Sequence, residues 1–571
     1  MASASPAVSI SEIIFSDGSA VKCSPSDVLV LVGPNNSGKS EALRGVRDKL
    51  TGPAHANPVI SRVSSTKSGS PADLLAWLGE WAPIRRPGTP GGSEFGAFGL
   101  RMHQNQCTLE WQLPDGGLGS MCRWFCYLLE AEERLDLGNP ASNISLTQEP
   151  PTHPIHFLLR DDQIEGRLSA RFRRAFGHDL IVHRNAGSTV PLYVGKRPVP
   201  VPPEDRVSLS YIERLEKLPT LRSQGDGMRS FAGVILATSV GRESILLIDE
   251  PEAFLHPPQA RLLGLSLVQE RGCSRQLFVA THSADVLRGM LDSGSPDVRV
   301  VRITRRDAVN IARVLDNARI GELWGDPLLR YSNILDGLFH DGVVVCEGDA
   351  DCRFYSAVHD SMCSAAEEGT RRPDVMFTHC GGKARLAVVI RALREVDVPV
   401  RAVADFDILS EEQPLREVIE ALGLAWSDVA GDWKLVKSAI DGKKPELSTT
   451  EVSEKIHSVL SRISEATFPG KAKDEIQSVL RRSSPWSNAK DVGKAFVPPG
   501  GPTKACERLL RLFRGSGLYV VEVGELESFV RSEGGHGPKW VNAVQGRDLL
   551  GDPELETART FVQELMQFGT A

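Results

Sequence analysis

Short apolar runs separated by amphipathic segments dominate the first half of the chain. Val28–Val32 reads Val-Leu-Val-Leu-Val, which is typical of a strand buried on both faces of a parallel sheet. Similar runs predict strands at Val8–Ile14, Ile245–Ile248, Gln276–Ala280, Val298–Ile303 and Asn310–Val314, and helices over about Met228–Thr238 and Pro258–Gln269. This alternation predicts one α/β sheet that draws on both ends of the first half.

The same alternation begins again at Val343. Strands are predicted at Val343–Cys346, Val375–Thr378, Val400–Ala404 and Leu518–Val523, with helices around Asp351–Asp360 and Ala384–Arg394. A long helical insert separates the last two strands. The second half therefore predicts a second α/β unit.

Regularity is lost after the first predicted helix. Gly52–Ala72, Pro83–Gly99 and Pro198–Pro203 are rich in Gly, Pro and Ser, which indicates insertion or lid material over roughly residues 52–220. We therefore expect an α/β chain of two domains, residues 1–320 and 341–571. A linker helix at 321–340 would join them, and the second domain would carry its helical insert at roughly 414–515.

Composition and charge narrow the class of protein. Of 571 residues, 41% are apolar and 24% are charged, as in ordinary globular domains. A net charge of -7 excludes a surface that is basic throughout, so a nucleic-acid site must be a local patch. No apolar run approaches the roughly 18 residues of a membrane span, and we expect no signal peptide. The ten cysteines form no Cys-x-x-Cys pair, which favours reduced thiols and a cytoplasmic protein.

Residues 33 to 40, Gly-Pro-Asn-Asn-Ser-Gly-Lys-Ser, match the GxxxxGK[ST] pattern of a phosphate-binding loop between a strand and a helix. The glycines allow backbone N–H groups to face a phosphate, and Lys39 would reach the β- and γ-oxygens of ATP while Ser40 would ligate Mg²⁺. The predicted nucleotide-binding residues of this loop are Gly33, Asn35, Asn36, Gly38, Lys39 and Ser40.

Two further elements of the first half carry candidate chemistry for the same nucleotide. The apolar strand that starts at Ile245 ends in Asp249 and Glu250, as a Walker B element does. Asp249 would hold Mg²⁺, and Glu250 would polarise the attacking water. His282 follows the next predicted strand within Thr-His-Ser and can contact the γ-phosphate there, although a lone histidine is often structural.

Ser223-Gln224-Gly225-Asp226-Gly227 precedes a predicted helix and lies upstream of the Walker B strand. This is the order of the ABC signature element, in which a serine hydroxyl and glycine amides at a helix N-terminus bind the nucleotide of another ATPase domain. Ser223, Gly225 and Gly227 are therefore candidate nucleotide ligands. Because each chain holds one such ATPase, we expect a homodimer or a higher homo-oligomer.

The order of these motifs resembles the ABC ATPase branch that includes SMC, RecF and OLD proteins, over roughly residues 1–315. Asp249-Glu250-Pro251-Glu252 followed by Leu255-His256-Pro257 is similar to the form of its soluble, DNA-handling members. The signature segment departs from the LSGGQ of transporters. The resemblance implies an ABC/SMC-like P-loop ATPase domain with insertions.

Carboxylates follow the predicted strands of the second half. Glu347 ends one strand and Asp351 lies one helical turn later, while Asp405 and Asp407 follow another strand at a spacing that puts both on one side of an extended chain. Hard divalent cations require such oxygen clusters. Their order on successive strand ends predicts a metal site.

This half resembles the Toprim domain, a Rossmann-like parallel sheet shared by topoisomerases, DnaG-type primases and OLD nucleases. Gly381-Gly382-Lys383 matches a further OLD-like element, and Gly524-Glu525-Leu526-Glu527 resembles the acidic motif that closes the OLD site. The resemblance implies two metals, Mg²⁺ or Mn²⁺, with Glu347, Asp405 and Asp407 in catalysis and Lys539 near the scissile phosphate. The implied metal ligands are Glu347, Asp351, Asp405, Asp407, Glu525 and Glu527.

An ABC ATPase followed by a Toprim domain is the arrangement of OLD family nucleases. It implies an ATP-regulated, metal-dependent DNA endonuclease or nickase in phage defence or DNA repair, with a helicase or another defence protein as a possible partner. The alternative is an SMC- or RecF-like DNA-binding ATPase with a non-catalytic Toprim scaffold. A topoisomerase or primase would need a tyrosine domain or a zinc module, for which neither length nor cysteine spacing leaves an obvious place.

The helical insert carries a basic segment. From Lys471 to Arg514 the sequence contains ten basic and four acidic residues, which gives a local charge of +6. We expect DNA backbone contact there, because each neutralised phosphate releases counterions. The alternative is a solvated face that pairs with acidic neighbours. The basic residues are Lys471, Lys473, Arg481, Arg482, Lys490, Lys494, Lys504, Arg508, Arg511 and Arg514.

Overall fold

A computed structural model describes residues 6–568, apart from 53, 83–93, 98–99, 147–148, 150, 242, 272–274, 307–308, 316–319, 322–324, 326–332, 367–371, 373, 444–448, 464–467 and 481–484. The chain divides into two compact units, Met1–Tyr331 and Ser332–Ala571, which we call the first and second unit. Among the described residues, no helix has the length and apolar character needed to cross a membrane.

A mostly parallel sheet forms the centre of the first unit. Among the described residues its strand order is β15-β14-β3-β13-β12-β7, and only β15 runs antiparallel to its neighbour. The inner strands β3 and β13 are buried along their whole length, as their continuous apolar sequences predict. The bounds are β3 Val28–Val32, β7 Cys126–Leu129, β12 Ile245–Asp249, β13 Gln276–Ala280, β14 Val298–Arg306 and β15 Val309–Val314.

Two strands of the first unit differ from the sequence prediction. β1 (Ala7–Phe15) does not join the central sheet, because it pairs antiparallel with β2 (Ala20–Lys22) and β4 (Ile60–Ser68) in a separate sheet. β7 lies within the segment predicted as an insertion, yet it forms the edge of the central sheet beside β12. The segment 52–220 is therefore not one continuous insertion, since it contributes β4 and β7 to the sheets.

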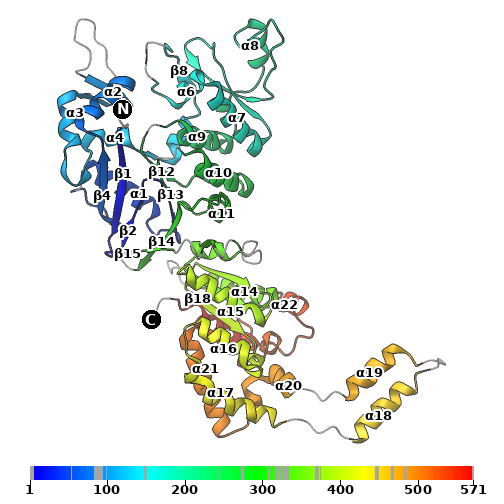
Figure 1. Ribbon diagram of the computed structural model, residues 1–571. Coiled ribbons are helices and arrows are strands. Elements are labelled where there is room, and N and C mark those ends of the chain that lie inside the picture. Colours follow the sequence, from blue (N-terminus) through cyan, green and yellow to red (C-terminus); the bar gives the residue numbers. More distant parts are fainter. Residues whose placement is uncertain are drawn as a thin grey trace, which may run out of the picture. The chain divides into compact units, whose positions relative to one another are not determined.

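Helices pack against the central sheet and against one another. α1 (Lys39–Thr51) contacts β7, β12 and β13, while α9 (Asp226–Val240), α10 (Pro257–Glu270) and α11 (Ala284–Asp292) follow one another along one side of the sheet (Figure 1). A Cβ at Gly289 would lie 1.9 Å from the carbonyl oxygen of Arg261, so α10 and α11 can approach this closely only with glycine there.

The remaining elements of the first unit lie between α1 and α9, in the less regular segment. Its helices α6 and α7 pack on α9. The bounds are α2 Pro71–Trp81, β5 Glu94–Ala97, β6 Leu100–His103, α3 Gln104–Trp111, α4 Cys122–Phe125, α5 Ala131–Asp136, β8 Ala141–Ser142, α6 Pro154–Arg160, α7 Asp162–Phe176, β9 Asp179–Val182, β10 Thr189–Val190, β11 Leu192–Gly195 and α8 Leu209–Leu215.

A four-stranded parallel sheet, β17-β16-β18-β19, forms the centre of the second unit as described. Buried side chains of α14, α22 and α23 share a core with its strands, and α15 packs on β16 and β18. The bounds are β16 Gly342–Cys346, α14 Asp349–Ser364, β17 Val375–His379, α15 Lys383–Glu395, β18 Val400–Ala404, β19 Leu518–Val520, α22 Pro538–Gln545 and α23 Glu556–Leu565. All carboxyl ends of the strands therefore meet at one edge.

The segment between β18 and β19 is helical, as predicted. α18 and α19 lie side by side as a pair (Figure 1), and α17 packs on α21. The bounds are α16 Glu412–Ala421, α17 Trp426–Asp441, α18 Thr449–Leu460, α19 Gly470–Leu480, α20 Pro485–Val492 and α21 Gly501–Ser516. Of the linker helix predicted at 321–340, half of the residues lie outside the described part, and Ile334–Phe339 form a 3-10 helix instead of an α-helix.

Candidate functional site

The loop between β3 and α1 has a backbone that only glycine fits at its first position. Gly33 has a φ of 147°, and a Cβ there would lie 2.0 Å from the carbonyl oxygen of Ile303. Gly38 also has a positive φ, 93°, directly before α1. Asn35 and Asn36 lie exposed at the tip of the loop. The loop is therefore folded as a phosphate cradle that ends at a helix N-terminus.

Lys39 is buried under this loop. Its Nζ donates to the carbonyl oxygens of Gly33 at 2.7 Å and Pro34 at 2.8 Å. Burial lowers the pKa of Lys39 to about 8. The nearby carboxylates of Glu250 and Glu252 have the opposite effect on this pKa but do not outweigh burial. The ammonium therefore already lies between the loop and the Walker B carboxylates, where a β- or γ-phosphate would be expected.

Ser40 and Asp249 lie together at the carboxyl end of β12. The Ser40 side chain hydrogen-bonds to Asp249, and burial raises the pKa of that carboxyl. The Oδ1 atom of Asp249 is buried without a hydrogen-bond partner. A hydroxyl beside a carboxylate oxygen that lacks a partner fits the ligand set of Mg²⁺, as the sequence predicts.

The turn after Asp249 brings three more side chains together. Glu250 has a positive φ of 45°, and its carboxylate lies 3.0 Å from Nε2 of His282. Burial, followed by the charge of Lys39, lowers the pKa of His282, although the nearby carboxylate of Glu250 raises it. Glu252 accepts hydrogen bonds from the Thr281 hydroxyl at 2.8 Å and from the backbone N–H of His282 at 2.7 Å. The Walker B turn and the Thr-His-Ser turn thus form one hydrogen-bonded unit.

Two residues of this site were missed in the sequence analysis. Glu130 directly follows β7, whose register pairs Leu129 with Ile248, so its carboxylate lies near Asp249, and it forms an ion pair with Arg44 at 2.9 Å. Arg134 is fully buried and donates to the main-chain oxygen of Asp249. The only available signal was β7 itself, a four-residue strand too short to stand out.

The signature segment meets the same turn within one chain. Gly225 is the N-cap of α9, with open space around the position of its Cβ. A Cβ at Gly227 would lie 2.7 Å from the carbonyl oxygen of Phe254, so the start of α9 packs closely against the Walker B turn. The Ser223 hydroxyl donates to the carbonyl of Thr220 at 2.7 Å.

In the second unit, the predicted carboxylates gather at the carboxyl edge of the parallel sheet. Glu347 Oε1 accepts the backbone N–H of Asp405 at 3.2 Å, and Asp351 Oδ2 accepts that of Gly348 at 2.8 Å. Burial, then repulsion from Asp405, raises the pKa of Glu347 to about 7. Burial also raises the pKa of Asp405 to about 6, although Lys490 lowers it. Buried, mutually repelling carboxylates of this kind mark functional sites.

The last two predicted carboxylate ligands, Glu525 and Glu527, lie beside a histidine. Side-chain ligand atoms of Glu525, Glu527 and His536 all lie within 4.8 Å of one another, and His536 was not among the predicted ligands. Burial, then repulsion from Glu527, raises the pKa of Glu525. Burial also raises the pKa of Asp351, and the negative charge of Glu527 raises it further. The carboxylates predicted as ligands thus interact electrostatically across the ends of three strands, β16, β18 and β19.

Lysines also approach this edge. Lys383, in the Gly-Gly-Lys turn, lies 3.5 Å from Asp407 and 3.2 Å from Glu411. Lys490, from α20, lies 3.1 Å from Asp405. Lys539 is exposed in the first turn of α22, and the N-cap of that helix, Gly537, donates to Glu527 at 2.7 Å.

Several residues of the predicted basic segment form ion pairs. Arg508 donates to Asp432 at 2.9 Å, Arg514 pairs with Glu522, and Lys494 lies 3.3 Å from Glu507. Pairing with acidic neighbours, the alternative interpretation, therefore holds for these side chains. Arg481 and Arg482 lie outside the described residues.

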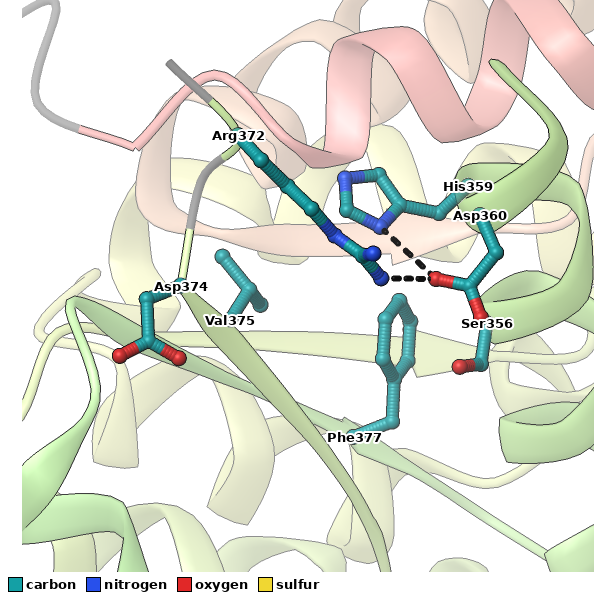
Figure 2. Close-up of a pocket in the computed structure, with 7 residues that line it drawn as sticks. All are labelled: Ser356, His359, Asp360, Arg372, Asp374, Val375 and Phe377. Atoms are coloured by element: carbon teal, nitrogen blue, oxygen red, sulfur yellow. Dashed lines mark hydrogen bonds and ion pairs between the residues drawn. The ribbon is translucent and has the colours of Figure 1, made fainter. Parts of the chain in front are cut away.

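A cavity of about 270 Å³ in the second unit is lined by none of the predicted metal ligands (Figure 2). His359, Asp360, Arg372 and Phe377 line it, and both His359 and Arg372 approach the Asp360 carboxylate. Val375, also in its wall, is the first residue of β17. The cavity therefore lies at the amino end of β17, whereas Glu347 follows the carboxyl end of the neighbouring strand β16.

Comparison with protein families finds an ATPase-type domain in the first unit. Residues 203–288 match the family described as "AAA domain, putative AbiEii toxin, Type IV TA system". This range contains the signature segment, Asp249, Glu250 and His282. An ATPase-type domain implies nucleotide binding.

Two curated proteins are similar to parts of the chain. Old nuclease of Escherichia phage P2 is 24% identical over 173 residues, 29% of this chain. The match spans only 28% of the length of Old nuclease itself. An uncharacterised protein of Methanocaldococcus jannaschii is 29% identical over 96 residues, 16% of this chain and 84% of that protein.

Solved structures of SMC head domains are also similar to the chain. A head bound to the C-winged helix domain of ScpA is 11% identical, with a TM-score of 0.33, and covers 55% of this chain and 99% of its own. The head domain from Thermotoga maritima is 11% identical, with a TM-score of 0.27, and covers 54% of this chain and 99% of its own.

Proposed function

We propose that this chain is an ATP-regulated, divalent-metal-dependent DNA endonuclease or nickase that serves in phage defence or DNA repair. The observation that carries the proposal is the carboxylate cluster at the edge of the second sheet, where burial and mutual repulsion raise the pKa of Glu347 to about 7 and that of Asp405 to about 6. Keeping such groups together costs stability unless a cation compensates. The similarity to Old nuclease supports the same assignment.

The donor set fits hard divalent cations. Each predicted ligand offers carboxylate oxygens, which suit Mg²⁺ and Mn²⁺. When bound, the metals would activate water and stabilise the leaving oxygen of a phosphodiester. Glu347 and Asp405 would hold them from neighbouring strands, and Asp407, Asp351, Glu525 and Glu527 would complete the ligand set. Lys539, exposed at the start of α22, would contact the phosphate.

The first unit would regulate this site through ATP. Lys39, Ser40 and Asp249 would bind the nucleotide and its Mg²⁺, Glu250 would orient water, and His282 would contact the γ-phosphate. The signature segment starts α9 with N–H groups that would bind a nucleotide held by a second copy of the chain. A homodimer is therefore part of the proposal.

The non-catalytic scaffold remains the second candidate, because Lys383 and Lys490 offset part of the repulsion among the carboxylates. A supercoiled-plasmid assay with Mg²⁺ or Mn²⁺, with and without ATP, separates the two. A nuclease would convert the plasmid to relaxed or linear DNA, and the Asp405→Asn substitution should abolish this cleavage. Intact plasmid under every condition, with ATP hydrolysis retained, would favour the scaffold.

A further inference from the structure

Lys490 reaches the carboxylate cluster from outside the parallel sheet. Its Nζ lies 3.1 Å from Oδ2 of Asp405 and 3.5 Å from Oε2 of Glu525. Asp405 follows β18 and Glu525 follows β19, and these strands are neighbours in the sheet. One ammonium thus bridges two strand ends that each carry a predicted metal ligand, Asp405 and Glu525.

The main chain at Lys490 is fixed against the turn that carries Glu525. A Cβ at Gly524, whose φ is 126°, would lie 2.1 Å from the carbonyl oxygen of Lys490. A Cβ at Gly493, just after α20, would lie 2.0 Å from the carbonyl oxygen of Glu522. Two glycines therefore allow backbone to contact backbone at Lys490 itself and three residues after it, at Gly493.

Side-chain hydrogen bonds hold the same helix at both ends. The indole of Trp486 donates to Asp441 at 2.9 Å, and the Ser528 hydroxyl donates to the carbonyl of Asp491 at 2.8 Å. The Lys490 side chain itself is 37% exposed, and several rotatable bonds separate its ammonium from the backbone. Its ammonium can therefore leave the carboxylates by a side-chain rotation while α20 stays in place.

The charges around this ammonium explain its position. Burial lowers the pKa of Lys490, but Asp405, Asp407 and Glu525 outweigh that effect and hold it above its usual value. Asp405 and Glu525 are mostly buried, with side chains 20% and 14% exposed, so little solvent screens their repulsion. Without a cation between them, these carboxylates would be destabilising.

We propose that Lys490 is a tethered counter-ion, whose ammonium neutralises Asp405 and Glu525 in the metal-free protein and is displaced from them when a divalent cation binds. This inference rests on the metal site of the proposed function. Lys490 is then a positioning residue that sets how tightly the site takes up metal. Removing its charge should strengthen metal binding, because the cation no longer has to break two ion pairs.

A titration of the nucleotide-free chain with Mn²⁺ tests the counter-ion role of Lys490. Electron paramagnetic resonance measures the concentration of free Mn²⁺ at each step. Lys490→Met should bind Mn²⁺ about tenfold more tightly than the parent, equivalent to about 1.4 kcal/mol. Lys490→Arg should bind like the parent. Lys494→Met is the matched control, since Lys494 lies in the same insert but pairs with Glu507 and Glu522, and its affinity should not change.

Asp405→Asn separates failure of this inference from failure of the proposed function. If Asp405→Asn binds Mn²⁺ as the parent does, the metal site itself is wrong. If Asp405→Asn loses binding while Lys490→Met binds no more tightly than the parent, the metal site stands and the counter-ion role is overturned.

Thermal unfolding distinguishes a counter-ion from a merely structural lysine. Lys490→Met should melt below the parent in EDTA, and saturating Mn²⁺ should remove the difference, because the metal then supplies the missing charge. Lys490→Gln should behave in the same way. A deficit of equal size with and without Mn²⁺ would contradict the proposal, as would parental behaviour of Lys490→Gln.

Discussion

The buried carboxylate of Glu252 accepts the backbone N–H of His282 at 2.7 Å. Its other oxygen, Oε2, is buried without a hydrogen-bond partner, and burial raises the pKa of the group. A side chain three residues after Asp249 therefore holds the turn on which His282 approaches Glu250. The geometry of the ATPase site depends on this link between two adjacent strands.

Glu252→Ala should lower kcat for ATP hydrolysis at least about tenfold with little change in KM, because His282 and Glu250 lose their alignment while the loop around Lys39 is untouched. Leaving the N–H of His282 unpaired should also cost about 1–3 kcal/mol of folding free energy. Steady-state kinetics and urea unfolding measure both. Glu252→Gln keeps the accepting oxygen and should retain most of the activity; equal losses in the two variants would refute this role.

Gly225→Ala should separate folding from assembly. Open space surrounds its Cβ position and its φ is -63°, so alanine fits and the melting temperature should change little. If the N-terminus of α9 binds the nucleotide of a second chain, ATPase activity should fall and lose its dependence on protein concentration. Gly33→Ala is the contrast, because its Cβ would clash with the carbonyl of Ile303 and should destabilise the first unit. Parental ATPase activity in Gly225→Ala would exclude the signature role.

The two sites should be separable by mutation. Lys39→Ala removes the ammonium that would face the phosphates of ATP and should abolish ATP hydrolysis, while Mn²⁺ binding at the carboxylates stays at the parental level. Asp405→Ala should do the reverse. ATPase assays and Mn²⁺ titrations on both variants check this, and ATPase loss in Asp405→Ala would show that its effect is not confined to the second unit.

Local motifs were predictable from the sequence, whereas long-range pairings were not. The loop that starts at Gly33 and the strand that ends in Asp249 can each be recognised from a few consecutive residues, because their glycines and apolar runs determine the local backbone conformation. Lys490 could be recognised only as one of ten basic residues, because its partner Asp405 lies 85 positions earlier. Arg134 gave no signal either, since its burial depends on how α5 packs against α9.

Metal binding at the carboxylates should release protons below neutral pH. Burial raises the pKa of Glu347 to about 7 and that of Asp405 to about 6, above their usual 4.5 and 3.8. These groups therefore stabilise the metal-free fold at low pH, and that contribution is lost as the pH rises through 6 to 7. A cation needs both groups ionised, so binding should release about 1.4 protons at pH 6, about 0.9 from Glu347 and about 0.5 from Asp405, and almost none at pH 8.

Calorimetric titration with Mn²⁺ in two buffers of different ionisation enthalpy measures this proton release. Glu347→Gln should reduce the release at pH 6 to about half a proton, the share of Asp405. Binding heats that do not depend on the buffer at pH 6 would contradict the raised pKa values.

DNA contact in the helical insert should now be sought on α21. Lys504, Arg508 and Arg511 share one helix face, but Arg508 is paired with Asp432, whereas Lys504 and Arg511 are exposed. If both exposed residues contact phosphates, replacing them by alanine should reduce the slope of log affinity against log salt by about 1.8 for duplex DNA, at about 0.9 per contact.

Fluorescence anisotropy of labelled duplex DNA over a range of salt concentrations measures this slope. The matched control is Arg508→Ala with Asp432→Ala, which removes an ion pair without changing the net charge and should leave the slope unchanged. Because the first unit is not altered, ATP hydrolysis without DNA should stay at the parental rate in both variants. An unchanged slope in the Lys504 and Arg511 double variant would exclude this helix face and place the backbone contacts on another surface.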